Sequence, residues 1–398
     1  MMKKNMMKNP TQHTPFFTRS ARAPGIRFSI VIPVKNEEGY ILKTLGSFAS
    51  QVDLSGNLLD PDVFEVLVLA NNCSDHSVTY IKAFMDEHPN LHIHLEEVTL
   101  GPSEANIGYI RRNLMECAYT RLSQNGGGIL MTTDADTMVA PDWIAQTHLE
   151  IENGAEVVGG RILLADDELD DLDEFTRLYH FKDEKYHLLI AELEGKIIHP
   201  TADPIPRHHQ HFNGSFAITS DCYARSGGVP VVEHLEDCAF FEQLQRIDAK
   251  IRHSHNVKVH TSARCIGRAE IGLSYQLNAW KNLGDQMEEY FVESCASISY
   301  RLQLKKSLLN LWERKYQPEL DLYSELKTIF PDVDLDDDVY TSFFDTRYFG
   351  AWYEQLIQIK QIQDQQEFPA VHIDTAITDL QAKLQEYDHQ DLAQTSMR

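Results

Sequence analysis

The segment from Gly128 to Asp142 constrains this chain most, because a short apolar run stops there at two closely spaced acids. The run Ile129-Leu130-Met131 is typical of a central strand that is covered on both faces. Asp134 and Asp136 follow, and their side chains point the same way if the backbone stays extended. Two like charges at a strand end are costly without a positive partner, and carboxylate oxygens suit Mg²⁺ or Mn²⁺. We therefore predict a site for a cation and a diphosphate, with a solvated acidic turn as the alternative.

The charge and the cysteines of the chain exclude several classes of protein. The 398 residues include 36 Lys and Arg against 60 Asp and Glu, a formal net charge of −24. Such a surface repels nucleic acid and anionic lipid, so neither is predicted as a primary partner. No apolar run is long enough to form a transmembrane segment. The six cysteines form no C-x-x-C pair, which predicts reduced thiols and a cytoplasmic protein rather than a zinc or disulfide framework.

The pattern of the chain predicts three parts. Residues 1–27 are basic and unpatterned, which predicts a disordered leader. Residues 28–268 alternate apolar strands with helical segments, which predicts an α/β domain with a mostly parallel sheet. From residue 269 onward glycine nearly disappears and helical spacing dominates, which predicts a helical C-terminal extension. That extension either packs on the sheet domain or forms the surface of a homodimer. Strands are expected at 28–33, 64–69, 91–98, 156–164 and 250–259, besides the run that ends at Asp134.

A second acid pair, Glu236 and Asp237, lies in the first turn of a predicted helix. Carboxylates at this place are explained by helix capping and the helix dipole, or by a general base held near a reacting group. Both interpretations stay open. Four histidines between residues 199 and 211 predict a polar pocket or a flexible lid, because their spacing is not that of a zinc site.

Common nucleotide-binding loops are missing from the sequence. No G-x-G-x-x-G follows the first predicted strand, and no G-x-x-x-x-G-K-[ST] is present. A phosphorylated ligand would therefore need a metal ion to hold its phosphates, which favours the cation interpretation of the first acid pair.

Four motifs then occur in a characteristic order: Ile-Val-Ile-Pro-Val-Lys-Asn-Glu-Glu at 30–38, Val-Leu-Ala-Asn-Asn-Cys-Ser-Asp at 68–75, Asp-Ala-Asp at 134–136 and Gly-Gly-(x)₇-Glu-Asp at 227–237. Together they resemble an inverting glycosyltransferase of family 2 with the GT-A fold, over roughly residues 28–268. The chain is also similar to bacterial soluble members through Ala105–Arg112 and Thr133–Thr137.

The resemblance implies a role for each matching residue. The donor nucleotide would be bound by Pro33, Val34, Asn36, Glu37, Asn71, Arg111 and Asp134. Asn71 stands where many members have an aspartate against uracil, so UDP is the leading expectation rather than a fixed one. The metal would be held by Asp136, Asp134 and His260. The donor sugar or the acceptor would lie over Asn213, Gly214 and Ser215, with Asp237 as the base and Glu236 supporting it.

The implied reaction moves a sugar from a nucleotide-diphosphate donor, with Mn²⁺ or Mg²⁺, to an acceptor hydroxyl with inversion. The acceptor stays open among small molecules, lipid-linked molecules and proteins. The main alternative is an inert sugar-nucleotide-binding or scaffold protein on the same fold, which would have no use for a second acid pair. A D-x-D-x-[TV] phosphohydrolase fits poorly because Met138 occupies the Thr or Val position. A sugar-nucleotide pyrophosphorylase would need a basic glycine-rich loop where Pro33–Glu38 stands.

Overall fold

The computed structural model describes residues 16–20, 23–232, 234–265, 267, 272–331, 333–364 and 368–395. Most of the predicted leader lies outside these residues. Phe17 and Ile26 do not behave as a disordered leader, because both are buried against the core of the sheet domain. Within the described residues, no helix combines the length and the apolar character that crossing a membrane requires.

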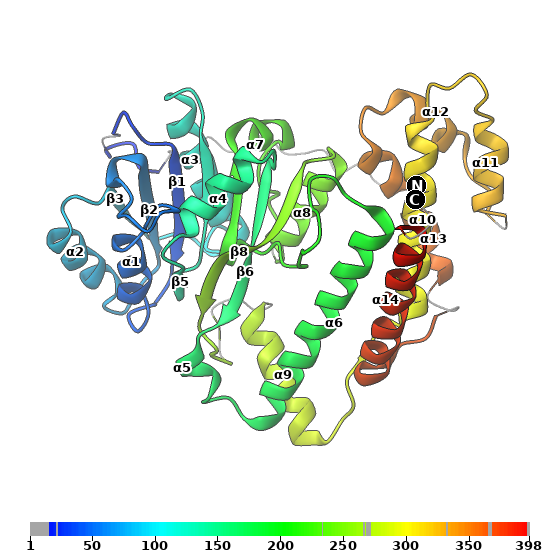
Figure 1. Cartoon of the computed structure of the whole chain (residues 1–398). Coiled ribbons are helices and arrows are strands. Elements are labelled where there is room, and N and C mark those ends of the chain that lie inside the picture. The colour runs from blue at the N-terminus through cyan, green and yellow to red at the C-terminus, as the bar shows by residue number, and fades with distance from the viewer. Residues whose placement is uncertain are drawn as a thin grey trace.

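One eight-stranded sheet forms the centre of the molecule, in the order β3-β2-β1-β4-β7-β6-β8-β5 (Figure 1). Its first four strands run parallel and are β1 (Phe28–Val34), β2 (Phe64–Asn71), β3 (Ile93–Val98) and β4 (Ile129–Thr132). The other four are β5 (Thr137–Val139), β6 (Val157–Leu164), β7 (Phe216–Thr219) and β8 (Ile251–Thr261). In this half only β6 and β8 pair in parallel, because β7 runs antiparallel to β4 and β6, and β5 runs antiparallel to β8.

The predicted α/β class is confirmed, since four of the seven strand pairings are parallel and helices cover the sheet. The short strands β5 and β7 were not expected. β7 has only four residues, and β5 has three, so neither produces a clear pattern of its own. Their positions depend on the pairing partners that the fold provides.

Helices cover both faces of the sheet, as the burial of its strands requires. Along β1, Ile30 and Ile32 pack into the core on one face and Val31 packs into the core on the other. The first face is covered by α1 (Ile41–Ala49), α2 (Ser77–Glu87) and α4 (Trp143–Glu152). The second face is covered by α3 (Ile107–Ser123), α7 (Ser220–Ser226) and α8 (Glu236–Arg246).

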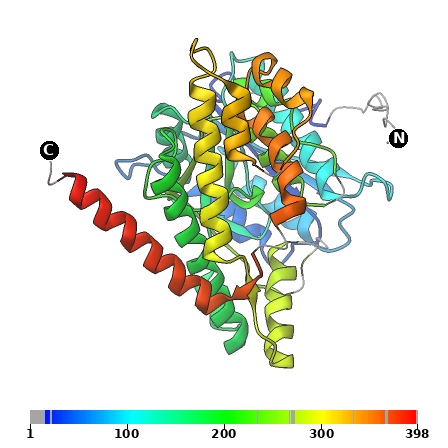
Figure 2. The same ribbon diagram turned by 90° about the vertical axis from the view of Figure 1, so that its right-hand side faces the viewer.

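The long helix α6 (Glu174–Ile198) lies between the sheet and the helices of residues 295–313 and 373–395 (Figure 1). It follows the short helix α5 (Asp166–Leu169), and it shares an apolar cluster with α10 (Cys295–Glu313) and α14 (Ile373–Thr395). Figure 2 shows these helices gathered on one side of the molecule, with α14 crossing α6 obliquely. The remaining elements of this part are α9 (Leu273–Gln286), β9 (Phe291–Val292), α11 (Leu322–Ile329), α12 (Asp337–Asp345), α13 (Phe349–Asp364) and β10 (Val371–His372).

The C-terminal extension is therefore helical and packs on the sheet domain through α6. A second apolar cluster, formed by α10 to α13 around Trp352 and Phe343, gives it a core of its own. The predicted homodimer surface stays a prediction.

Candidate functional site

The first acid pair lies in a turn directly after β4. The backbone N–H of Thr137 donates to the carbonyl oxygen of Asp134 at 3.3 Å, so the chain does not stay extended through this segment. The condition for both carboxylates to point the same way, an extended backbone, is therefore not met. The charge of Asp134 nevertheless acts on Asp136, because it adds to burial in raising the pKa of Asp136. The Asp134 side chain is 41% exposed and that of Asp136 only 13%.

Each of these aspartates has its own guanidinium partner. Arg111 Nη2 donates to Asp134 Oδ1 at 2.7 Å, and Arg264 Nη2 lies 2.7 Å from Asp136 Oδ2. The hydroxyl of Ser262 also donates to Asp136 Oδ2, at 2.8 Å. Each carboxylate of the turn therefore faces a guanidinium group, which is the kind of positive partner that two neighbouring acids require.

Arg264 joins the turn to the loop after β1. Its Nη1 and Nη2 donate to the two carboxylate oxygens of Glu37 at 2.6 and 2.8 Å. Burial lowers the pKa of Arg264, but the Glu37 hydrogen bonds and the Asp136 charge outweigh it and raise that pKa. Sequence reasoning missed this residue. Its only signal was a basic position in a polar loop shortly after the last strand.

Arg111 on α3 connects the two acid pairs. Its side chain is 3% exposed, and it donates to the Thr132 hydroxyl as well as to Asp134. Its Nε lies 3.8 Å from Glu236 Oε1 and has no hydrogen-bond partner among the described residues. Protein groups thus hold Arg111 between the two acid pairs, and its contact with the donor nucleotide stays a prediction.

The second acid pair begins α8. Glu236 Oε1 accepts from Asn213 Nδ2 at 3.0 Å, and Asp237 Oδ1 accepts from the backbone N–H of Cys238 at 2.9 Å. The contact to Cys238 is not a capping bond, because the N-cap residue of α8 is Leu235 and no described side chain caps this helix. Burial raises the pKa of Glu236 and of Asp237. Both carboxylates are therefore better proton acceptors than exposed ones, which the general-base interpretation requires.

The residues predicted under the donor sugar lie between the two acid pairs. They form a short 3₁₀ helix at Asn213–Ser215 that leads into β7. The carbonyl of Gly214 accepts from the Thr133 hydroxyl at 2.8 Å, and a Cβ on Gly214 would lie 3.3 Å from Asp134 Oδ2. Ser215 lies behind them, fully buried, where its hydroxyl accepts from the indole N–H of Trp143. Asn213 and Gly214 thus border the site, and Ser215 supports it from below.

The residues predicted around the nucleoside gather where β1 and β2 end side by side. Val34 at the end of β1 pairs with Ala70, so Pro33, Val34 and Asn71 lie at one edge of the sheet. Val34 and Asn71 are buried. Asn36 crosses to the next loop, where its Oδ1 accepts from the backbone N–H of Ser74 at 2.7 Å. The structure therefore brings this predicted group together.

His260 does not join the acids. It pairs with Met138 in the register of β5 and β8, and its neighbour Thr261 directs its hydroxyl toward Asp136 at 3.5 Å. Because successive side chains of a strand point to opposite faces, His260 faces away from Asp136. Among the described residues, no three His, Cys, Asp or Glu side chains are grouped to hold a metal ion. The predicted set of three ligands is therefore not assembled, although the charges of Asp134 and Asp136 still interact.

A family comparison identifies the sheet domain. Residues 29–202 match the family described as Glycosyl transferase family 2. The match covers less than half of the chain and lies within its sheet domain. The match identifies a glycosyltransferase domain, and its α/β sheet agrees with the predicted GT-A fold. The matched segment contains the first acid pair and ends ahead of Glu236 and Asp237.

Several solved glycosyltransferases are similar to this one. S. aureus TarS 1-349 in complex with UDP-GlcNAc has a TM-score of 0.40 and 12% identity, with 76% of this chain and 70% of that chain covered. The mannosyltransferase PcManGT from Pyrobaculum calidifontis, in complex with GDP-Man and Mn²⁺, has a TM-score of 0.42 and 14% identity, with 87% and 90% covered. Glucosyl-3-phosphoglycerate synthase from Mycobacterium tuberculosis has a TM-score of 0.33 and 18% identity, with 71% and 91% covered. At such values, these likenesses assign no ligand or residue role to this glycosyltransferase. No curated protein sequence matches it.

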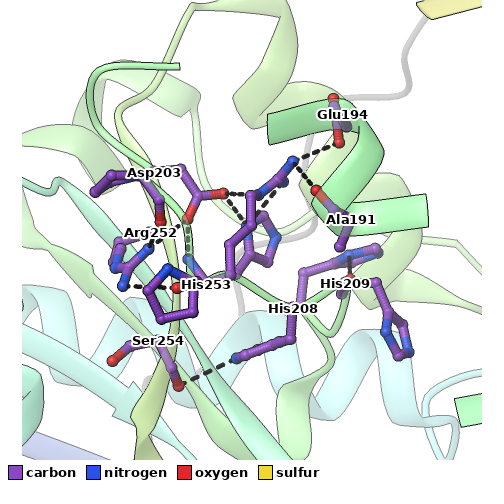
Figure 3. Close-up of polar contacts among 12 residues, drawn as sticks. Ala191, Glu194, Asp203, His208, His209, Arg252, His253 and Ser254 are labelled. Carbon is purple, nitrogen blue, oxygen red and sulfur yellow. Dashed lines mark hydrogen bonds and ion pairs between the residues drawn. The ribbon is translucent and has the colours of Figure 1, made fainter. Parts of the chain in front are cut away.

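Part of the histidine-rich stretch is bonded into the fold. Asp203 accepts from His253 Nδ1 at 2.7 Å, from Arg207 Nε at 2.7 Å and from Arg252 Nη1 at 3.1 Å (Figure 3). Arg207 also donates to Glu194 of α6 at 2.7 Å. Asp203 and Arg207 are thus bonded within the fold. His199, by contrast, is exposed, and His209 Nδ1 has no hydrogen-bond partner among the described residues, so the interpretation as a polar pocket or lid stays a prediction.

The same stretch fixes the helix that carries the second acid pair. The ring of His211 stacks on Phe241 of α8, with centroids 3.7 Å apart and planes 10° from parallel. Phe241 lies one helical turn after Asp237, on the same side of α8. Two residues beyond His211, Asn213 binds Glu236. The stretch therefore holds the start of α8 from two sides.

Proposed function

We propose that this glycosyltransferase moves a sugar from a nucleoside-diphosphate donor to an acceptor hydroxyl with inversion, assisted by Mn²⁺ or Mg²⁺. A UDP-sugar is the first donor to test. The observation that carries the proposal is Arg111, which contacts Asp134 at 2.7 Å and lies 3.8 Å from Glu236. Through this one side chain, the acids suited to a cation and the acids suited to a base border the same site.

On the donor side, the loops after β1 and β2 would receive the nucleoside. The carboxyl ends of parallel strands are where open α/β sheets bind their ligands, and Asn36, Glu37 and Asn71 stand there. The diphosphate would extend from these loops toward Asp134, whose side chain is the more exposed of its pair.

Asp134 and Asp136 fit a divalent cation in chemistry. They offer hard oxygen ligands, and burial together with their mutual repulsion favours a positive charge beside Asp136. These two residues would hold the cation, and His260 would not. When bound, the cation would neutralise the negative charge that develops on the departing diphosphate. Donor binding and proton transfer would be carried out by side chains of the protein.

On the acceptor side, Asp237 would take the proton from the attacking hydroxyl. Burial raises its pKa, so its carboxylate binds a proton more strongly than an exposed one. Glu236 would hold the start of α8 in place, through its bonds to Asn213 and its proximity to Arg111. A base that is separate from the donor allows the hydroxyl to attack opposite the leaving group, which inverts the anomeric centre.

The direct test is a donor panel with the purified full chain. UDP- and GDP-sugars are incubated with an acceptor mixture, with Mn²⁺ or with a chelator, and released nucleoside diphosphate and glycosylated products are measured by mass spectrometry. We expect metal-dependent product from a UDP-sugar, with an inverted anomeric centre by NMR. Nucleotide binding by thermal shift without product from any donor would contradict the proposal and favour an inert binding protein.

A further inference from the structure

The loop that follows β8 returns to the site and places a cation on two of its acids. Arg264 lies in this loop, and its side chain is 19% exposed. It forms two hydrogen bonds to Glu37, at 2.6 and 2.8 Å, and it reaches Asp136 Oδ2 at 2.7 Å. Its guanidinium also lies 5.4 Å from the centre of the Tyr40 ring. One side chain therefore ties together the residues predicted for the nucleoside and for the metal.

The carboxylate that Arg264 contacts is the one that a cation would use. Asp136 Oδ2 accepts from Ser262 as well as facing Arg264, while Asp136 Oδ1 lies 3.3 Å from the Thr137 hydroxyl. A divalent cation on this carboxylate would stand next to the guanidinium, and two positive charges at such a distance repel each other. Simple removal of Arg264 would leave a buried carboxylate without a positive partner, which is costly. Replacement of the Arg264 guanidinium by the divalent cation at Asp136 is therefore more favourable than removal of the guanidinium alone.

The contacts also show how Arg264 would remain in place after such an exchange. Its paired hydrogen bonds to Glu37 do not involve Asp136. Paired bonds between a guanidinium and a carboxylate are strong and geometrically fixed. Losing the contact to Asp136 therefore leaves Arg264 anchored beside the nucleoside loop.

We propose that Arg264 and the divalent cation compete for Asp136, so that Arg264 occupies the cation position of the free enzyme. This inference rests on the proposed function, because it assigns the same aspartate to the donor's metal. It makes Arg264 a positioning residue of the donor site. It also gives the free enzyme a closed state, in which Glu37 and Asp136 are tied together until a cation replaces Arg264.

The experiment measures Mn²⁺ binding to the full chain by electron paramagnetic resonance of the free ion, without any nucleotide. Wild type is compared with Arg264→Gln, which removes the competing charge. The matched control is Arg314→Gln, which removes a guanidinium paired with Glu325 at 2.8 Å in the C-terminal helices. We expect Arg264→Gln to bind Mn²⁺ about tenfold more tightly than wild type, within the range of about 5- to 150-fold usual for coupled sites. The control should bind Mn²⁺ as wild type does.

An equal or weaker affinity for Mn²⁺ in Arg264→Gln would overturn the proposal. The second variant, Arg264→Lys, keeps the charge but not the planar fork that matches a carboxylate, so its affinity should fall between wild type and Arg264→Gln. If Arg264→Lys bound Mn²⁺ as tightly as Arg264→Gln, lost packing rather than charge would explain the effect, and the proposal would again fail. Binding is measured below the melting temperature of each variant.

Failure of this inference differs from failure of the proposed function. If wild type transfers sugar in the presence of Mn²⁺ while the variants show no change in Mn²⁺ affinity, only the competition is refuted. If the donor panel gives no product, the transferase proposal is refuted whatever the variants bind.

Discussion

The two acid pairs of the site have opposite surroundings, although Arg111 lies beside both. Asp134 and Asp136 stand in a turn after β4, with one guanidinium 2.7 Å from each. Glu236 and Asp237 stand at the start of a helix, where the nearest guanidinium nitrogen is 3.8 Å from Glu236 and a neutral amide provides the closer contact.

This difference teaches how the fold assigns two roles to the same chemical group. The first pair is balanced by cations, so it suits the binding of positive charge. Burial raises the pKa of Asp136 as well as those of Glu236 and Asp237, so the pairs differ in their guanidinium contacts rather than in the direction of these shifts. The second pair, whose guanidinium is more distant, suits the uptake of a proton. The predictions below test whether the two pairs are separate in function, from the largest expected effect to the smallest.

Replacing Asp237 by Asn should have the largest effect. The amide keeps the size of the side chain but cannot take the proton of the acceptor, so kcat should fall by about 10²- to 10⁴-fold. Donor affinity, measured by calorimetry with Mn²⁺ present, should stay unchanged because Asp237 belongs to the second pair. Asp221→Asn, at an exposed first turn of α7, is the matched control and should retain full activity. Full turnover by Asp237→Asn would remove this residue from the base position.

Replacing Asp136 by Asn should show the reverse pattern. The loss of one carboxylate ligand should weaken Mn²⁺-dependent donor binding by roughly 100-fold, which corresponds to about 3 kcal/mol. The pH dependence that belongs to the second pair should be retained in the residual activity. Asp142→Asn, in the same segment but bonded to Gln146, is the control. A normal metal requirement in Asp136→Asn would end the division of roles between the pairs.

Replacing Asn213 by Ala tests the contact between the second acid pair and the short helix that lies between the two pairs. Its amide holds Glu236 at 3.0 Å, and a hydrogen bond to a charged group contributes about 1.5–3 kcal/mol. We expect kcat to fall by about tenfold with little change in donor affinity. Asn113→Ala, which loses a bond to a backbone carbonyl on α3, is the control. If donor affinity fell and kcat did not, Asn213 would serve the first pair instead.

The pH profile should show the smallest effect. Burial raises the pKa of Asp237 above its ordinary value of 3.8, and a general base must be deprotonated. The value of kcat/KM should therefore be constant at neutral pH and fall as the pH drops through that raised pKa. An acid limb that is unchanged in the residual activity of Asp237→Asn would assign the titration to another group.

Stability must be followed over the same pH range, because the histidine-rich stretch responds to acid as well. Burial lowers the pKa of His208 and His209 to about 2, from 6.5. These histidines are neutral in the folded protein, so their contribution to stability is present above pH 6.5 and is lost as the pH falls below it. The slope is about 1 kcal/mol per pH unit for each histidine. A melting temperature that falls with acidification separates this effect from the titration of Asp237.

The amino-acid sequence determined the strands that are buried on both faces and the two acid pairs. Apolar runs such as Phe28–Val34 and Phe64–Asn71 were predictable, because such runs can only be buried between covering helices. The first acid pair was recognisable because its charges follow one of these runs directly. Such patterns are local, since each depends on neighbouring residues of the chain.

The tertiary structure alone decided how those residues meet. The turn at Asp134, the outward face of His260 and the pairing of Arg264 with Glu37 and Asp136 all depend on contacts between distant segments. The bonds of Arg207 to Glu194 and of Asp203 to His253 depend in the same way on distant segments. A sequence pattern reports whether a side chain is buried, but its partner is set by strand register and by the packing of helices. For that reason the acids could be found from the sequence, while their cations and their surroundings could not.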